Sequence, residues 1–133
     1  IYTDDGVSLE YDGTGECAWL NTHCQNYGFV IRYAADKTQL TSIDYEPWHF
    51  RYVGKPHASF MTDQNLCLEE YIAYLREYPF SEGHLQVQDS DGNHYEIYYV
   101  PATGEMTQVP VPDKNPYTMS GNNVDGFIIT VSL

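Results

Sequence analysis

Basic residues are scarce in this sequence. Lysine and arginine together number 6 among 133 residues, against 19 aspartates and glutamates, so the formal net charge is −13 at neutral pH. The deficit is strongest in residues 81–133, which hold a single basic residue and 7 acidic ones. Nucleic acids are bound through clustered lysines and arginines that neutralise phosphates. The composition therefore argues against a nucleic-acid partner and favours a neutral or cationic ligand.

Long apolar runs and paired cysteine motifs are also missing. No stretch approaches the roughly 18 residues that a membrane-spanning helix needs, and none follows a basic segment as in a signal peptide. Cys17, Cys24 and Cys67 show no C-x-x-C spacing, so they predict neither a zinc ribbon nor a disulfide framework. We interpret them as small core residues. The first residue, Ile1, suggests a processed chain or a piece of a longer one.

Hydrophobic periodicity predicts mixed helices and strands over the first 80 residues. Apolar residues at i, i+3, i+4 and i+7 from Leu68 to Leu75 indicate the longest helix. The expected elements are a strand end at Ile1 and Tyr2, a helix over 16–26 stopped by Gly28, a strand over 29–33, a polar loop over 34–42, a strand over 43–54, a short helix beginning at Pro56 and a helix over 66–78.

Composition changes between Pro79 and Gly83, where we place a boundary between a domain of residues 1–80 and a small all-β appendage of residues 81–133. Alternating apolar residues predict a hairpin in which Leu85 faces Tyr99 and Val87 faces Ile97, across a loop centred on Gly92. Further strands are expected at Met106, Val109 and Val111, and in a last hairpin formed by 117–120 and 127–131.

The segment from Ile43 to Gly54 combines a carboxylate and an imidazole. Pro47 pushes Glu46 toward an extended conformation. Strand parity would place Glu46 beside the large aromatics Trp48, Phe50 and Tyr52, on the expected buried face, while His49 points the other way. A charged carboxylate among aromatics is costly without a partner, so we predict a bend that brings Glu46 beside His49. The pattern alone leaves two interpretations open, a structural hydrogen bond and a metal site in which Glu46 is a base.

The block Glu46-Pro-Trp-His49, continued by Arg51-Tyr-Val-Gly54, resembles the C-terminal half of VanY-type D-alanyl-D-alanine carboxypeptidases. The segment Tyr27-Gly-Phe-Val-Ile-Arg-Tyr33 stands at the matching distance before it. Ala18-Trp19-Leu20 and Leu68-Glu-Glu-Tyr71 fit as well, so the resemblance covers residues 1–78. It implies an α+β fold, an antiparallel sheet with packed helices, that is N-terminally truncated here and is followed by the all-β hairpin region.

The resemblance also implies the site and its cofactor. His49 would be one of three zinc ligands, and Glu46 the general base. Tyr33 and Trp48 are candidates to line the substrate pocket, although Trp48, like Arg51, is a motif residue whose first role is structural. The substrate would be a peptidoglycan stem peptide that loses its terminal D-alanine, and the location extracytoplasmic, through secretion or anchoring by upstream sequence.

One departure from the family pattern limits what these residues can do alone. The other two ligands, a histidine and an aspartate, belong to a Ser-x-His-x-x-Gly-x-Ala-x-Asp motif that should end just before Ile1 and is absent. We expect this chain to carry one ligand of three, to bind zinc weakly and to be inactive without the segment that completes the site.

Three other functions stay open. The same scaffold supports L,D-carboxypeptidases and D,D-dipeptidases, and a non-catalytic cell-wall-binding module is the third possibility. The tyrosines of the appendage could stack on a glycan or form its own core; they are Tyr95, Tyr98, Tyr99 and Tyr117.

Overall fold

The computed structural model of the chain describes residue 6 and residues 10–133, so the strand end expected at Ile1 and Tyr2 lies outside the described residues. The elements in chain order are 3-10 helix η1 (Gly15–Cys17), α1 (Trp19–His23), 3-10 helix η2 (Cys24–Tyr27), β1 (Phe29–Ile31), 3-10 helix η3 (Ala35–Lys37), α2 (Thr38–Thr41), β2 (Phe50–Tyr52), α3 (Lys55–Asp63), α4 (Leu68–Leu75), β3 (Leu85–Gln88), β4 (His94–Pro101), β5 (Tyr117–Gly121) and β6 (Gly126–Ser132). Within the described part of the chain, no helix has both the length and the apolar character needed to cross a membrane.

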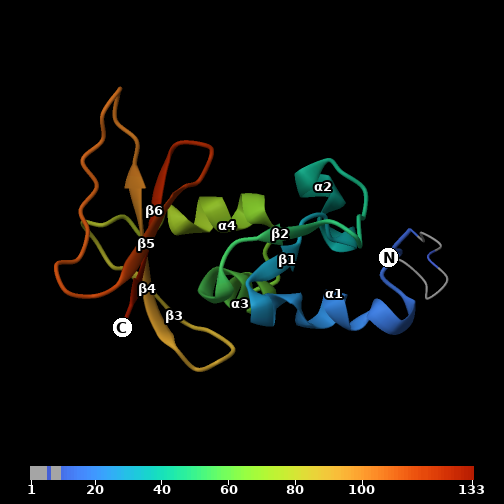
Figure 1. Ribbon diagram of the computed structural model, residues 1–133. Helices are drawn as coiled ribbons and strands as arrows, with labels where there is room; N and C mark the ends of the chain where they lie inside the picture. The colour runs from blue at the N-terminus through green and yellow to red at the C-terminus, as the bar shows by residue number, and fades with distance from the viewer. Residues whose placement is uncertain (1–5, 7–9) are drawn as a thin grey trace.

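These elements form two antiparallel sheets with helices between them, which confirms the α+β class (Figure 1). Strands β1 and β2 pair with each other near α1 and α2. The second sheet has the order β3-β4-β6-β5 and lies at the opposite end of the molecule, with α3 and α4 between the two. The final hairpin predicted for 117–120 and 127–131 is confirmed as β5 and β6.

The helices of the first 80 residues follow the sequence signals closely. The segment 16–26 is helical, although it is split into η1, α1 and η2. Gly28 ends it in the left-handed conformation, with φ of 84°, which a residue without Cβ adopts at low cost. The polar loop expected over 34–42 is wrong, because this segment forms η3 and α2. Short helices at a surface bury few apolar side chains, so the polar composition of this segment gives no helical periodicity.

Helices α3 and α4 bury their apolar sides against the rest of the fold. Pro56 lies in the first turn of α3, as predicted, where its missing N–H leaves no broken hydrogen bond. The Glu70 side chain accepts a hydrogen bond from the Cys67 backbone N–H at 2.9 Å, which starts α4 at Leu68. Tyr71 and Leu75 are the buried residues of this helix, at the spacing that one helix face requires.

The register of the β3–β4 hairpin differs from the prediction by two residues. Leu85 pairs with Ile97 and Val87 with Tyr95, so the loop spans residues 89–93. The reason is the Asp89 side chain, whose Oδ1 accepts hydrogen bonds from the backbone N–H groups of Asp91 and Asn93 at 2.9 and 3.0 Å. An aspartate that caps its own turn in this way stabilises a five-residue loop that hydrophobic alternation alone does not reveal.

The segment between β4 and β5 contains no strand among its described residues, so the strand predicted at Met106, Val109 and Val111 is wrong. Prolines interrupt the segment and remove the backbone donors that a sheet needs, and Met106 is fully exposed. The segment instead covers one face of the second sheet, where Val109 packs against buried β4 and β6 residues. Tyr98 donates a hydrogen bond to the Pro110 carbonyl at 2.8 Å.

One buried cluster contains side chains from both sides of the boundary expected near residue 80. It includes Met61 and Leu75 from the helices, and Ile97 and Ile128 from the second sheet. The division into residues 1–80 and 81–133 stays a prediction. Tyr98 and Tyr99 are buried in the two faces of the sheet, so these tyrosines serve the core. All three cysteines are free, and Cys24 and Cys67 are buried as interpreted.

Candidate functional site

The Glu46–His49 segment forms a tight turn that leads into β2. The Glu46 backbone N–H donates to the Tyr33 carbonyl at 3.1 Å, and the His49 N–H donates to the Glu46 carbonyl at 3.1 Å. The Arg32 N–H then bonds the His49 carbonyl at 2.7 Å, so His49 is aligned with the sheet. Because both residues precede the strand, the parity rule that separated them does not apply.

The bend brings the two side chains together. His49 Nδ1 lies 2.9 Å from Glu46 Oε2, a hydrogen bond and ion-pair distance. The Glu46 side chain is 29% exposed and that of His49 is 45% exposed, so both are open to solvent on one side. Among the described residues, the other ring nitrogen of His49, Nε2, has no hydrogen-bond partner.

Residues near the N-terminus pack against the turn and hold it in place. Pro47 is buried, and its carbonyl accepts a hydrogen bond from the Asn21 side chain at 3.1 Å. Gly13, with φ of 86°, lies so close that a Cβ there would be 2.8 Å from the Pro47 Cβ. This contact holds the Glu46–Pro47 bend in place, and it needs glycine at position 13.

Tyr33 lies beside the pair. Its ring meets the His49 imidazole edge-on, with centroids 5.1 Å apart, and the Arg32 guanidinium lies 4.6 Å above the same tyrosine ring. Tyr33 therefore packs against His49 and limits the rotation of its ring. The burial expected for Trp48 and Tyr52 is wrong, because they are 56% and 62% exposed. In the described structure neither the helices nor the second sheet covers that face of β2.

The pair by itself fits only part of a zinc site. Structural and catalytic zinc ions are held by three or four protein ligands. Within the described ranges, no group of three or more histidine, cysteine, aspartate or glutamate side chains is arranged to hold a metal. His49 can offer Nε2 while Glu46 orients the ring through Nδ1, an arrangement common around metal-bound histidines. Among the described residues, the pair could thus offer one histidine ligand and one carboxylate.

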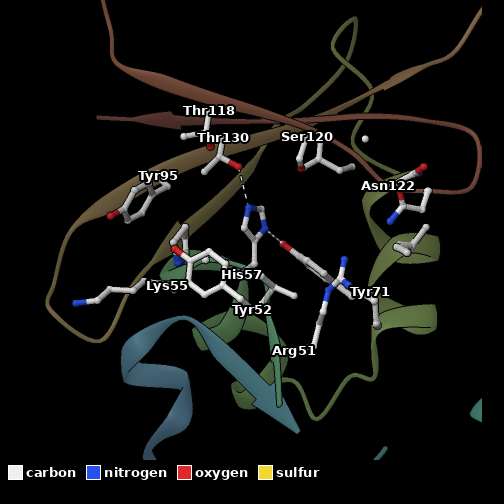
Figure 2. Close-up of a pocket in the computed structure, with 18 of the residues that line it drawn as sticks. Arg51, Tyr52, Lys55, His57, Tyr71, Tyr95, Thr118, Ser120, Asn122 and Thr130 are labelled. Carbon is white, nitrogen blue, oxygen red and sulfur yellow. Dashed lines mark hydrogen bonds between the residues drawn. The ribbon is translucent and has the colours of Figure 1, made fainter. Parts of the chain in front are cut away.

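A second polar centre, missed by the sequence reasoning, lies between the helices and the second sheet. His57 on α3 bonds Tyr71 Oη through Nδ1 and Thr130 Oγ1 through Nε2, both at 2.8 Å (Figure 2). Burial lowers the pKa of His57 to about 4, because a charged imidazole would lose its hydration there. The imidazole is therefore neutral at pH 7. No sequence motif marks it, since its partners lie 14 and 73 residues away.

A carboxylate beside an imidazole is an arrangement that metal-assisted hydrolysis can use, with the imidazole as ligand and the carboxylate as base. Residues 3–55 match the family described as VanY, D-alanyl-D-alanine carboxypeptidase. The chain is therefore related to the VanY-type D-alanyl-D-alanine carboxypeptidases, as the Glu-Pro-Trp-His block predicts.

Two related proteins extend the similarity beyond residues 3–55. A D-alanyl-D-alanine carboxypeptidase of Enterococcus faecium is 46% identical over 129 residues, which are 96% of this chain and 41% of that protein. The bifunctional D-Ala-D-Ala dipeptidase and D-Ala-D-Ala carboxypeptidase VanXYC of Enterococcus gallinarum is 58% identical over 74 residues, 56% of this chain and 39% of that protein.

Among solved structures, the vancomycin resistance D,D-dipeptidase VanXYg, in complex with a D-Ala-D-Ala phosphinate analog, superposes with a TM-score of 0.84 at 38% identity. The match covers 93% of this chain and 49% of that one, so it includes the second sheet as well as the Glu46–His49 segment. The chain spans less than half the length of each of these three relatives.

Proposed function

We propose that these residues belong to a zinc-dependent carboxypeptidase that removes the terminal D-alanine from peptidoglycan stem peptides. The observation that carries the proposal is the hydrogen-bonded Glu46–His49 pair, held on its bend inside the Glu-Pro-Trp-His block. The names of the relatives support the substrate, because the E. faecium and E. gallinarum proteins are D-alanyl-D-alanine carboxypeptidases by name. The remaining zinc ligands would come from a segment outside these 133 residues.

His49 would bind the metal and Glu46 would act as the general base. Zinc, when bound, would acidify a water molecule and polarise the scissile carbonyl. The Glu46 carboxylate lies beside the His49 ring, and in the proposed role it would take the proton from the attacking water and pass it to the leaving amine. Tyr33, packed edge-on against His49, and the exposed Trp48 would line the substrate pocket.

Substitutions at Glu46 and His49 distinguish two roles for Glu46, a general base and a residue that only orients His49. Glu46→Gln keeps a side chain that can accept a hydrogen bond from Nδ1 but removes the base. In the intact protein, if Glu46 is the base, hydrolysis falls by at least about 100-fold while zinc affinity changes little. If Glu46 only orients His49, zinc affinity itself falls, by about 10- to 100-fold. His49→Ala should weaken zinc binding in either case, and near-normal activity of Glu46→Gln would rule out the base assignment.

A D,D-dipeptidase or L,D-carboxypeptidase activity is the alternative on the same scaffold. The dipeptidase alternative is supported by VanXYC and VanXYg, which are D,D-dipeptidases by name. Hydrolysis of free D-Ala-D-Ala, of a pentapeptide ending in D-Ala-D-Ala and of a tetrapeptide ending in L-Lys-D-Ala, compared side by side, distinguishes the three activities. Because peptidoglycan lies outside the membrane, we place the protein at the cell wall or cell surface, secreted or anchored by sequence beyond these residues.

A further inference from the structure

The three arginines of this acidic chain all line one cavity. Arg32, Arg51 and Arg76 surround a space of about 380 Å³ between the two-stranded sheet, α4 and the β5–β6 turn. We call it the arginine groove and define it by Arg32, Arg51, Arg76, Leu68, Ile72 and Asn123. A single acidic residue, Glu69, contributes to the same lining. In a chain of net charge −13, half of the six basic residues therefore gather at one place.

Two of the three arginines are neutralised and held in position. Arg32 Nη1 donates to Glu69 Oε2 at 3.0 Å, and this hydrogen bond raises the pKa of Arg32 and lowers that of Glu69. Arg76 Nε donates to Asp125 Oδ2 at 2.8 Å. These pairs join the residue after β1 to α4, and the C-terminal end of α4 to the β5–β6 turn. They compensate two of the three positive charges of the groove and leave the third.

Arg51 is the arginine that keeps its charge uncompensated. Among the described residues it has no hydrogen-bond partner and no carboxylate within 4.0 Å. Strand pairing aligns Arg51 with the buried Val30, so its side chain is directed toward α4. Figure 2 shows it reaching from β2 into the space below the second sheet, toward the side where Asn122 lies. Its guanidinium can therefore offer two parallel N–H groups to a planar oxyanion.

The opposite wall of the groove carries a side-chain amide on a turn whose backbone is held in place. Asn122 Oδ1 accepts the backbone N–H groups of Val124, Asp125 and Gly126 at 2.9, 2.9 and 3.0 Å, which closes the β5–β6 turn. The next residue, Asn123, has φ of 60°, a conformation that few residues with a side chain adopt. In the described structure, the Asn123 amide has no hydrogen-bond partner, so it is available to a ligand.

The arginine groove opens into a larger cavity of about 560 Å³ that shares Arg51, Leu68 and Ile72 with it. The larger cavity adds the apolar side chain of Ile128 and the hydroxyls of Thr118 and Ser120. A combination of apolar floor, hydroxyls and amides matches a peptide chain better than a bare inorganic ion. We propose that the arginine groove binds a carboxylate of a peptide ligand, paired with Arg51 and Asn123, while the rest of the peptide extends into the larger cavity.

The position of the groove connects it to the candidate active site. Arg51 follows His49 by two residues, about 7 Å along the chain, and Arg32 bonds the His49 backbone. The groove is therefore a neighbour of the Glu46–His49 pair along β2, although neither Glu46 nor His49 lines it or the larger cavity. That the peptide ligand is a peptidoglycan stem peptide rests on the proposed function. The carboxylate preference rests on the arginine geometry alone.

Binding measured without catalysis tests the proposal. The chain is titrated, in EDTA, with L-Ala-γ-D-Glu-L-Lys-D-Ala-D-Ala and with its two forms in which one carboxylate is an amide. Saturable binding is expected, with at least about tenfold loss when the bound carboxylate becomes an amide, since Arg51 then loses a hydrogen-bond partner that carries the opposite charge. The amide form that loses affinity identifies the carboxylate.

Arg51→Gln should cause the same tenfold loss and remove the difference between acid and amide. Lys114→Gln is the matched control, because it makes the same charge change at a basic residue outside both cavities, and it should bind normally. If Arg51→Gln does not fold, Arg51→Lys and Asn123→Ala take its place, and both should weaken binding.

The proposal fails if the Arg51 and Lys114 variants lose affinity equally, if neither amide form binds more weakly, or if a tenfold excess of inorganic phosphate displaces the peptide completely. Because the titration needs no zinc and no turnover, its result is independent of the hydrolysis assays. Peptide binding by the chain that does not depend on Arg51 refutes this inference alone. Arg51-dependent binding by the chain, together with absence of hydrolysis by the intact zinc-loaded protein, refutes the proposed function alone.

Discussion

His57 is the residue at which α3, α4 and β6 meet, and its protonation should control the stability of the fold. Its two ring nitrogens bond Tyr71 and Thr130 at 2.8 Å each. Burial lowers its pKa from 6.5 to about 4. In the unfolded chain the imidazole takes up a proton near pH 6.5, whereas in the folded chain it resists protonation down to about pH 4.

The sign of the effect follows from proton binding. Between pH 6.5 and 4 the unfolded state binds more protons at His57 than the folded state does, so acidification favours unfolding. The stabilising contribution is complete above pH 6.5 and lost near pH 4. A shift from 6.5 to about 4 corresponds to about 3 kcal/mol, an upper value because the ring borders the larger cavity and water reaches part of it. This is a large share of the roughly 5–15 kcal/mol that stabilises a domain.

Urea unfolding at a series of pH values between 7 and 4 measures this contribution. The free energy of unfolding should decrease more steeply with falling pH in the wild type than in His57→Gln, which cannot titrate but can still bond one neighbouring hydroxyl. His94→Gln, at an exposed histidine of β4, should retain the wild-type slope. Carboxylates also titrate in this range, but they contribute equally to all three proteins. Equal slopes in wild type and His57→Gln would refute the argument that His57 is neutral and desolvated in the fold.

Three other measurements address the turns and the metal. Gly28→Ala should lower the free energy of unfolding by at least about 1 kcal/mol, because a Cβ at this left-handed position would lie 2.8 Å from the Tyr52 ring. The control is Gly83→Ala, where a Cβ would have nothing within 4 Å. Equal melting temperatures of the two variants would contradict the expectation. Asp89→Ala should destabilise the β3–β4 hairpin by about 1–3 kcal/mol, seen as faster amide exchange in β3 than in β6. Zinc titration of the 133-residue chain at neutral pH should show weak binding, and a tight one-to-one site containing His49 would disprove the incomplete ligand set.

Local features of the site could be predicted because their causes lie within a few residues. Pro47 restricts Glu46, and a carboxylate needs a partner, so the bend that joins Glu46 to His49 follows from four consecutive residues and is confirmed at 2.9 Å. The α4 helix is equally local, since the spacing from Leu68 to Leu75 shows its buried face. The predicted β3–β4 register is wrong by two residues, because the hydrogen bonds of the Asp89 side chain set the loop length and apolar alternation does not show them.

The sequence by itself determined most of the helices and strands, the bend and the resemblance of the Glu-Pro-Trp-His block, because each depends on neighbours along the chain. Only the tertiary structure decided which surfaces are covered and which distant residues meet. Trp48 is exposed although it is large and aromatic, since burial depends on what packs above a strand. Arg32, Arg51 and Arg76 share one groove only because pairing of β1 with β2 and packing of α4 bring them together. Long-range contacts of this kind leave no periodic signal, and the carboxylate site that we propose rests on them.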